Sequence, residues 1–320
     1  MKAGDLELRP ATLDDAAFVA DVQTAAHPDD VEDPKMLRHF WSMTGRDVTV
    51  ERFIATTGGT PVGYATRSHQ SWAKMPGRFG RVGAELLPDA WTAGRLDALV
   101  GLMEEHSRDD GAKKVTIWAW ERDIRRIDAL TARGFREERR ERYWELDLVE
   151  GRERITKMAT ASRVRMKQEG IRVLTLGEDG DPKKWEKLKR MSDEAEDDVP
   201  TTVPNVTMDM ADWLKWWDGP GVHLDRVWIA REGDDIVGIS QLAYPPVRGV
   251  VATDWTGMAR KARGRGIARA LKCETLVQAI GLGVDRVRTD NDSTNTPILH
   301  INETMGYARR PDQVQLLKEL

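Results

Sequence analysis

The sequence has little of several residue types on which whole classes of protein depend. Its 320 residues include one cysteine, Cys273, which excludes an internal disulfide and indicates a reducing compartment. Its six histidines are not paired with cysteines or carboxylates at the spacings of metal ligands, so we predict no metal site. No apolar run approaches the roughly 20 residues of a membrane span, and residues 1–5 lack an apolar signal region. We therefore expect a cytoplasmic protein that does not enter a membrane.

Charge and length narrow the class further. The net charge of −4 gives no basic excess, which argues against a nucleic-acid partner. Hydrophobic and charged contents of 40% and 32% are typical of a globular protein. A chain of 320 residues is too long for one ordinary core and favours two domains of about 150 residues each.

Tryptophan, by contrast, is frequent, with twelve residues in the chain. Trp213, Trp216 and Trp217 follow the spacing i, i+3, i+4, which is that of one helix face. Such a stripe indicates a buried core, and an aromatic wall for an apolar or cationic ligand is the alternative.

The chain repeats itself. Residues 53–63 match residues 228–238, an offset of 175 (238 minus 63). Gly94 and Gly266 correspond at an offset of 172, and so do the pairs at 134–135 and 306–307. Matches in one order at a near-constant offset predict a tandem duplication of one fold unit.

Each copy predicts the same order of elements. A short strand (residues 6–8; 173–176) precedes a helix (13–26; 182–196) and two strands joined by a glycine turn (48–65; 227–243). A strand, a loop, a long helix, a strand, a helix and closing strands follow. This order predicts a mixed α/β fold with helices packed on a central sheet. We place the domains at 1–154 and 155–320, joined by a helix over residues 151–170.

One loop in the second copy has the features of an anion site. Residues 263–268 read Arg-Gly-Arg-Gly-Ile-Ala and separate a strand-like run (250–258) from a helix-like run (267–282). The free N–H groups and positive dipole end of a helix's first turn favour an anion there. A basic cluster surrounds the loop, and we interpret it as neutralised by a bound anion: Arg260, Lys261, Arg263, Arg265, Arg269 and Lys272.

The loop also fits the pattern Arg/Gln-x-x-Gly-x-Gly/Ala, and here the chain resembles the GNAT acyltransferase superfamily. The order of elements extends the resemblance over nearly the whole chain, in a two-copy plan similar to that of mycothiol synthase and antibiotic-related acetyltransferases. The resemblance implies two tandem GNAT folds that use acetyl-CoA as co-substrate. It implies the following cofactor-binding residues: Thr256, Met258, Arg263, Gly264, Arg265, Gly266, Ile267 and Ala268.

The first copy lacks these features. Trp91 and Leu96 stand where the second copy has Arg263 and Ala268, and a leucine there would crowd a pyrophosphate. Residues 289–307 of the second copy carry a polar series with Asn291, Asn295 and Asn302. The matching positions of the first copy carry Ala119, Asp123, Arg126 (opposite Ile298) and Leu130. We interpret the first copy as degenerate, kept for structure or as a wall of the substrate pocket; a second site with an altered ligand is the alternative.

That polar series contains three asparagines. In the resembled family, two neighbouring strands separate at this point to admit the pantetheine arm, which implies contacts from Asn291 and Asn295. Asn295 can also cap the next helix. Asn302, in mid-helix, cannot cap, so we expect a ligand or a buried partner for it.

The chemistry implied is direct attack of an amine on a thioester, without an acyl-enzyme. We predict Asp254 as general base, since Asp254, Thr256 and Met258 alternate along one strand and should share a face, and the Met258 N–H as oxyanion donor. Other candidate carboxylates are Glu194, Asp197 and Asp198.

Asn302 stands where the resembled family usually has a tyrosine that acts as general acid, and an asparagine cannot donate a proton to the CoA sulfur. Tyr307 or Tyr244 could substitute, or the thiolate leaves unprotonated. Cys273 lies within a helix and is interpreted as packing.

The sequence thus predicts an acetyl-CoA-dependent N-acetyltransferase acting on a primary amine of a small molecule, as a monomer or homodimer. Two alternatives stay open. One is a different acyl or aminoacyl donor, and the other is a non-catalytic CoA-binding sensor or scaffold.

Overall fold

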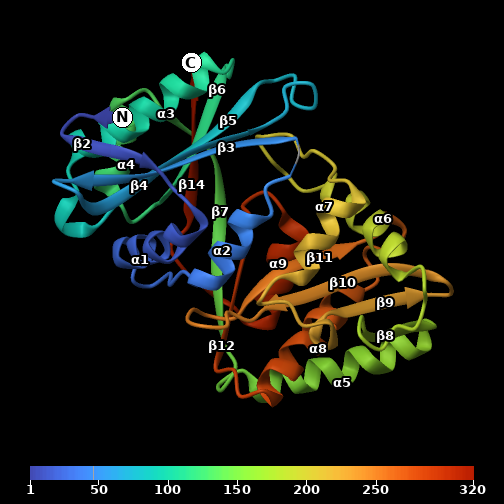
Figure 1. Ribbon diagram of the computed structural model, residues 1–320. Helices are drawn as coiled ribbons and strands as arrows, with labels where there is room; N and C mark the ends of the chain where they lie inside the picture. Colours follow the sequence, from blue (N-terminus) through green and yellow to red (C-terminus); the bar gives the residue numbers. More distant parts are fainter. Residues whose placement is uncertain (46) are drawn as a thin grey trace.

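The computed structural model describes residues 1–45 and 47–320 and has a mixed α/β architecture, as predicted (Figure 1). In the first half (residues 1–150) the elements are β1 (Lys2–Ala3), β2 (Leu6–Pro10), α1 (Ala16–Ala26), α2 (Pro34–Ser42), β3 (Val48–Thr57), β4 (Thr60–Gln70), β5 (Phe79–Leu86), α3 (Ala93–Asp109), β6 (Lys114–Trp120), α4 (Ile124–Ala132) and β7 (Arg136–Asp147). In the second half (residues 151–320) they are α5 (Arg152–Gln168), β8 (Ile171–Thr175), α6 (Lys184–Glu196), α7 (Met210–Leu214), β9 (Trp228–Glu232), β10 (Asp235–Ala243), β11 (Ala252–Met258), α8 (Ile267–Gly281), β12 (Arg286–Asp292), α9 (Thr296–Met305), β13 (Ala308–Arg309) and β14 (Gln313–Glu319). None of the helices in the described residues has the length and apolar character to cross a membrane.

The two halves repeat one order of elements around separate cores, which confirms the predicted duplication. One core cluster includes Leu99, Ile117 and Phe135 of the first half, and another includes Ile229, Ile239 and Leu271 of the second. The predicted connecting helix is present as α5, which packs along α8. In the second half α5 and α8 lie on one face of the sheet and α6 on the other (Figure 1).

The tryptophan stripe is largely core. Trp213 and Trp217 pack against each other and against Trp185, and all three belong to or line the second-half core. Trp216 is 40% exposed and contacts Phe40 of α2 edge-on. The prediction of a buried face therefore holds for two of the three tryptophans.

The strands of both halves form one continuous sheet in the described residues, in the order β1-β2-β3-β4-β5-β6-β14-β7-β12-β11-β10-β9-β8. The long strand β7 joins the two parts (Figure 1). Its residues up to Glu141 pair with β14, and those from Glu141 onward pair with β12. A single strand thus serves both halves.

The halves also exchange strands. β14, the last strand of the chain, pairs with β6 along its whole length, from Gln313 opposite Trp120 to Glu319 opposite Lys114. Val314 and Leu316 of β14 are buried in the first-half core. The second half in turn takes the end of β7 as the neighbour of β12. The structural units therefore do not divide cleanly at residues 154 and 155, because the ends of the two segments are interchanged.

Each half has one place where two neighbouring parallel strands separate. β5 and β6 pair at three positions, from Phe79 opposite Lys114 to Arg81 opposite Thr116. β11 and β12 pair at one, Ala252 opposite Arg288. Beyond these pairs the strands diverge, and we call the two gaps the first-half opening and the second-half opening.

Candidate active site

A β-bulge in β11 borders the second-half opening. Gln241 of β10 lies opposite Trp255 and Leu242 lies opposite Thr253, so Asp254 is the extra residue without a partner. Such a bulge locally bends the strand and redirects a side chain. Asp254, the candidate base, therefore lies at the bulge itself.

The bulge overturns one expectation from the sequence. Asp254 accepts a hydrogen bond from Gln241, whereas Thr256 contacts Ser240, the preceding residue of β10, at 3.0 Å. Adjacent strand residues point to opposite faces, so Asp254 and Thr256 do not share a face. The prediction of one shared face for Asp254, Thr256 and Met258 is wrong, because regular alternation is interrupted at residue 254.

The backbone of Met258 points into the opening. The N–H of Ala259 donates to the carbonyl of Val237 at 3.0 Å, which marks a hydrogen-bonded pair of the antiparallel ladder. Such pairs alternate with pairs that are not hydrogen-bonded, and Gly238 opposite Met258 is the next pair. The Met258 N–H is therefore directed away from β10, toward β12, where the predicted oxyanion donor should be.

Two carboxylates flank the opening at corresponding positions. Asp254 and Asp290 each lie two residues beyond the Ala252–Arg288 pair, and both are reached by solvent. Restricted hydration raises the pKa of the Asp254 carboxyl, which a hydrogen bond from Gln241 partly offsets. Restricted hydration and the charge of Asp254 raise the pKa of Asp290 to about 6. Carboxyls with raised pKa values are suited to accept a proton near neutral pH.

The glycine loop leads into α8 in the predicted way. Gly264 and Gly266 have φ values of +73° and +79°, which side-chain-bearing residues rarely adopt. Gly266 is the N-cap of α8, and no side chain of a described residue caps this helix. The N–H groups at Ile267 and Ala268 in the first turn are thus available to an anion.

The arginines around the loop are held by carboxylates. Asp198 binds both Arg260 and Arg263, at 2.7 and 2.6 Å, and Glu169 and Glu232 bind Arg265. Three arginines of the cluster are thus already paired within the chain, so their charges do not by themselves call for a bound anion. The candidate acids Glu194 and Asp198 hold this loop, since Glu194 accepts from the Arg260 N–H.

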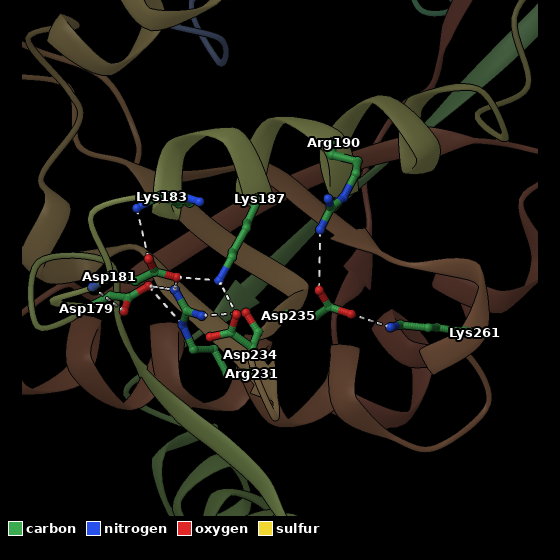
Figure 2. Close-up of polar contacts among 9 residues, drawn as sticks. All are labelled: Asp179, Asp181, Lys183, Lys187, Arg190, Arg231, Asp234, Asp235 and Lys261. Carbon is green, nitrogen blue, oxygen red and sulfur yellow. Dashed lines mark hydrogen bonds and ion pairs between the residues drawn. The ribbon is translucent and has the colours of Figure 1, made fainter.

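A polar network fixes the loop from the edge of the sheet (Figure 2). Asp235, at the start of β10, binds Lys261 at 2.6 Å and Arg190 of α6 at 3.3 Å. Nearby, Asp179 binds the buried Arg231 at 2.5 Å. These contacts join α6, the β9–β10 turn and the loop, and they direct Lys261 toward the turn.

Two asparagines, Asn291 and Asn302, form a pair at the end of β12. Asn302 is fully buried, and its amide nitrogen donates to the side-chain oxygen of Asn291 at 2.7 Å. The expected buried partner of Asn302 is therefore Asn291. The Asn302 Oδ1 atom has no hydrogen-bond partner among the described residues. Asn295 is the N-cap residue of α9, but its side chain makes no capping hydrogen bond, so its polar atoms stay available.

The corresponding helix start in the first half is closed. The side chain of Thr92 caps α3 by accepting from the Arg95 N–H at 3.1 Å. Leu96, the counterpart of Ala268, is buried in the first-half core. A helix start capped in this way offers fewer free N–H groups to a ligand.

The first-half opening faces a cavity and is partly occupied by an arginine. Arg126 of α4, the counterpart of Ile298, is buried and donates to the carbonyl of Ala84 at 2.9 Å and to Glu85 at 3.1 Å. His27 contacts the same carboxylate oxygen of Glu85, with its Nε2 atom 3.3 Å from Oε2. The guanidinium therefore takes the backbone carbonyl that a ligand in this opening would need.

A cavity of about 520 Å³ lies between the halves. We call it the inter-half cavity; its polar and aromatic lining is Gln23, His27, Asp30, Glu32, Tyr64, Glu85, Trp118, Trp120, Arg126, Tyr143, Arg288, Thr289, Asp290 and Gln313. Arg126 is paired with Glu85, and Arg288 with Asp30. Glu32 and Asp290 have no ion-pair partner among the described residues, and burial raises the pKa of Glu32. The lining therefore has an excess of negative charge.

Sequence reasoning missed Asp290 and misplaced Lys272. Asp290 could have been found by aligning the two parallel strands, since it lies level with Asp254. Lys272 was counted with the surface cluster at the loop, yet it is 2% exposed and its Nζ lies 5.3 Å from the centre of the Tyr307 ring. Cys273 is buried and burial raises its pKa to about 11, which agrees with a packing role.

Known structures identify the fold. No protein-family model and no curated protein matches the sequence. A tandem GNAT protein from the clavulanic acid biosynthesis pathway superimposes with a TM-score of 0.75 at 14% identity, covering 98% of both chains. A GCN5-related N-acetyltransferase from Sphaerobacter thermophilus gives 0.69 at 19% identity, covering 98% of this chain and 96% of that one. An acetyltransferase of the GNAT family from Colwellia psychrerythraea gives 0.62 at 11% identity, with 98% and 100% covered.

The protein therefore has the tandem GNAT fold, as its repeat and loop predicted. Identities this low establish the fold and leave the reaction to be argued from the site.

Proposed function

We propose that the protein transfers an acetyl group from acetyl-CoA to a primary amine of a small molecule, with the donor in the second half. The observation that carries this proposal is the combination of an uncapped helix start at Gly266 with an opening between β11 and β12. The first half lacks this combination, because Thr92 caps its helix and Arg126 bonds the Ala84 carbonyl at its opening. Solved structures of this fold are described as acetyltransferases, which supports the same reaction class.

The donor would be held by backbone groups more than by the arginines. The pyrophosphate would bind the N–H groups at Ile267 and Ala268, and the pantetheine arm would enter the second-half opening beside Asn291 and Asn295. The fit is supported by the free first turn of α8 and by the space around Gly264, where an added Cβ atom would meet nothing within 4 Å.

The acceptor would occupy the inter-half cavity. Its unpaired carboxylates, Glu32 and Asp290, favour a positively charged ligand, which an amine is at neutral pH. Asp290 borders both the cavity and the opening, so a bound ammonium group there would lie beside the thioester. This placement gives the first half a role in substrate binding.

The residues present fit the chemistry of direct transfer. Asp254, which lies level with Asp290 beside the opening, takes a proton from the bound ammonium. The free amine then attacks the thioester carbon. The Met258 N–H donates to the developing oxyanion, and such donors are worth several kcal/mol in a water-poor site, on the order of 3 kcal/mol each. The C–S bond then breaks, the nitrogen loses its second proton, and the sulfur takes up one proton, so that CoA leaves as its thiol.

The donor site is tested by isothermal titration of acetyl-CoA into wild type, Ala268→Glu and Ala268→Gln. Substitution at Gly266 is unsuitable, because its φ of +79° would strain any side chain. A carboxylate in the first turn of a helix suits the helix dipole, so Ala268→Glu should fold normally while repelling a pyrophosphate. We expect one site in wild type, weakening by ~10-fold or more in Ala268→Glu, and a much smaller loss in Ala268→Gln.

Activity is then measured as CoA thiol release with a panel of primary amines. Acetyl transfer that disappears in Asp254→Asn supports the proposal. Two binding sites, or binding unaffected by Ala268→Glu, would show that the donor lies elsewhere. One-site binding without transfer to any amine would favour the CoA-binding sensor instead.

A further inference from the structure

Lys272 is a buried lysine with no hydrogen-bond partner for its Nζ atom among the described residues. Its side chain is 2% exposed and lies on α8, facing the ring of Tyr307. A buried ammonium group without a partner is costly, so such groups are rare unless a function retains them.

The fold itself does not need a lysine at this position. At the offset of 172, the first half has Val100, Leu130 and Phe135 where the second half has Lys272, Asn302 and Tyr307. All three first-half residues are buried in a well-packed core. The same helix packing is therefore achieved with apolar side chains only, and the polar set belongs to the half whose opening is free.

Both unpartnered groups have a neighbour on β12, the strand that borders that opening: the charge of Asp290 acts on Lys272, and Asn302 bonds Asn291. Lys272 comes from α8, and Asn302 from α9, where it bonds Asn291 at the end of β12. The Nζ of Lys272 and the Oδ1 of Asn302 are both buried and without hydrogen-bond partners among the residues described. A donor and an acceptor left unsatisfied near the end of β12 indicate a missing polar ligand.

We propose that Lys272 is the proton donor to the departing CoA thiolate, in place of the tyrosine that Asn302 replaces. This role rests on the proposed function. As the amine nitrogen bonds to the acetyl carbon and the C–S bond breaks, the sulfur receives the electron pair of that bond and a proton from the Lys272 ammonium. Asp254 releases the first ammonium proton to solvent, and the second nitrogen proton, lost as the amide forms, returns to Lys272 through solvent or Asp290. One ammonium and one thioester thus give one amide, one thiol and one proton in solution.

The surroundings of Lys272 suit this role. Burial lowers its pKa to about 8, and the charges of Cys273 and Asp290 act in the opposite direction. From β12 it faces Asp290, and from the segment after α9 it faces Tyr307, whose pKa burial raises. The α5 side contributes Arg163, which is bound to Glu274 at 2.7 Å. On β10, the residues toward α8 are Gly238 and Ser240, which do not titrate in this range. Among the described neighbours, Lys272 is thus the group placed to lose its proton near pH 8.

The test compares the pH dependence of kcat in wild type, Lys272→Met and a matched control, Lys318→Met. Lys318 is the control because its Nζ lies 5.6 Å from the Phe135 ring in the first half, the counterpart of the Lys272–Tyr307 contact. In wild type kcat should fall as the pH rises above about 8. In Lys272→Met that alkaline limb should disappear and kcat should drop about 100-fold, near the lower end for a lost general acid. Lys318→Met should keep the wild-type profile.

A second readout does not depend on turnover. The thiol of bound CoA is titrated by the ultraviolet absorbance of its thiolate, and the nearby ammonium should make it ionise at a lower pH in wild type than in Lys272→Met. Unchanged kcat, a retained alkaline limb in Lys272→Met, or equal thiol pKa values in both proteins would overturn the role of Lys272 alone. A wild type that binds no acetyl-CoA would overturn the proposed function, and the role of Lys272 with it.

Discussion

Replacing Leu316 by alanine should lower the stability of the first half, although residue 316 lies in β14, the last strand of the chain. Leu316 is 2% exposed, pairs with Ile117 of β6, and belongs to the first-half core. Truncation of a buried leucine to alanine costs about 2–5 kcal/mol, since transfer and cavity terms add. Against a total stability of about 5–15 kcal/mol, this is a large loss.

The assay is urea unfolding combined with hydrogen exchange resolved by segment. Amides of β5 and β6 should exchange faster in Leu316→Ala, while those of β9 and β10 should change less. Glu319→Ala, at an exposed position of the same strand, is the control and should alter stability by about 0.5 kcal/mol or less. Faster hydrogen exchange confined to β9 and β10, or a loss of stability as small as that of Glu319→Ala, would refute the conclusion that β14 stabilises the first half.

Three further predictions concern buried or unpaired charges. Lys272→Met should be more stable than wild type by about 3 kcal/mol, because the folded-state pKa of Lys272, about 8, lies below the usual 10.5. The gain in stability should be full below pH 8 and shrink toward pH 10.5, which urea titrations at several pH values would measure. A loss of stability at pH 7 would contradict this prediction. Arg126→Leu should cost about 3–5 kcal/mol, because it leaves the buried Glu85 carboxylate with His27 and the Leu86 N–H but without its arginine, and adding Glu85→Leu should recover most of this in thermal melts. Glu32→Gln should raise KM for amine acceptors several-fold with little change in kcat, and an unchanged KM would remove the inter-half cavity from substrate binding.

The repeat, the element order and the glycine loop could be predicted because they are local. A helix or strand is recognisable from its own periodicity, and Gly264 and Gly266 take positive φ values where the sequence places two glycines close together. Two copies of the same signals, one after the other, then gave the tandem fold.

The properties that could not be predicted depend on how distant segments align. The direction of Asp254 follows from a register shift between β10 and β11, which no alternation within β11 encodes. The burial of Lys272 depends on the packing of α8 against the segment at Tyr307, whereas its neighbours in sequence are surface arginines. The position of Arg126 at the first-half opening could not be predicted, because it depends on α4 lying beside Ala84.

The exchange of strands has a consequence for synthesis on the ribosome. The first half cannot complete its sheet when residue 150 has emerged, because the strand that lies between β6 and β7 is β14, residues 313–319. Until then the edges of β6 and β7 present unpaired backbone groups, which are prone to join other chains. We therefore expect the nascent chain to acquire its full native protection late and in one step, with the two halves closing together rather than in the order of their translation.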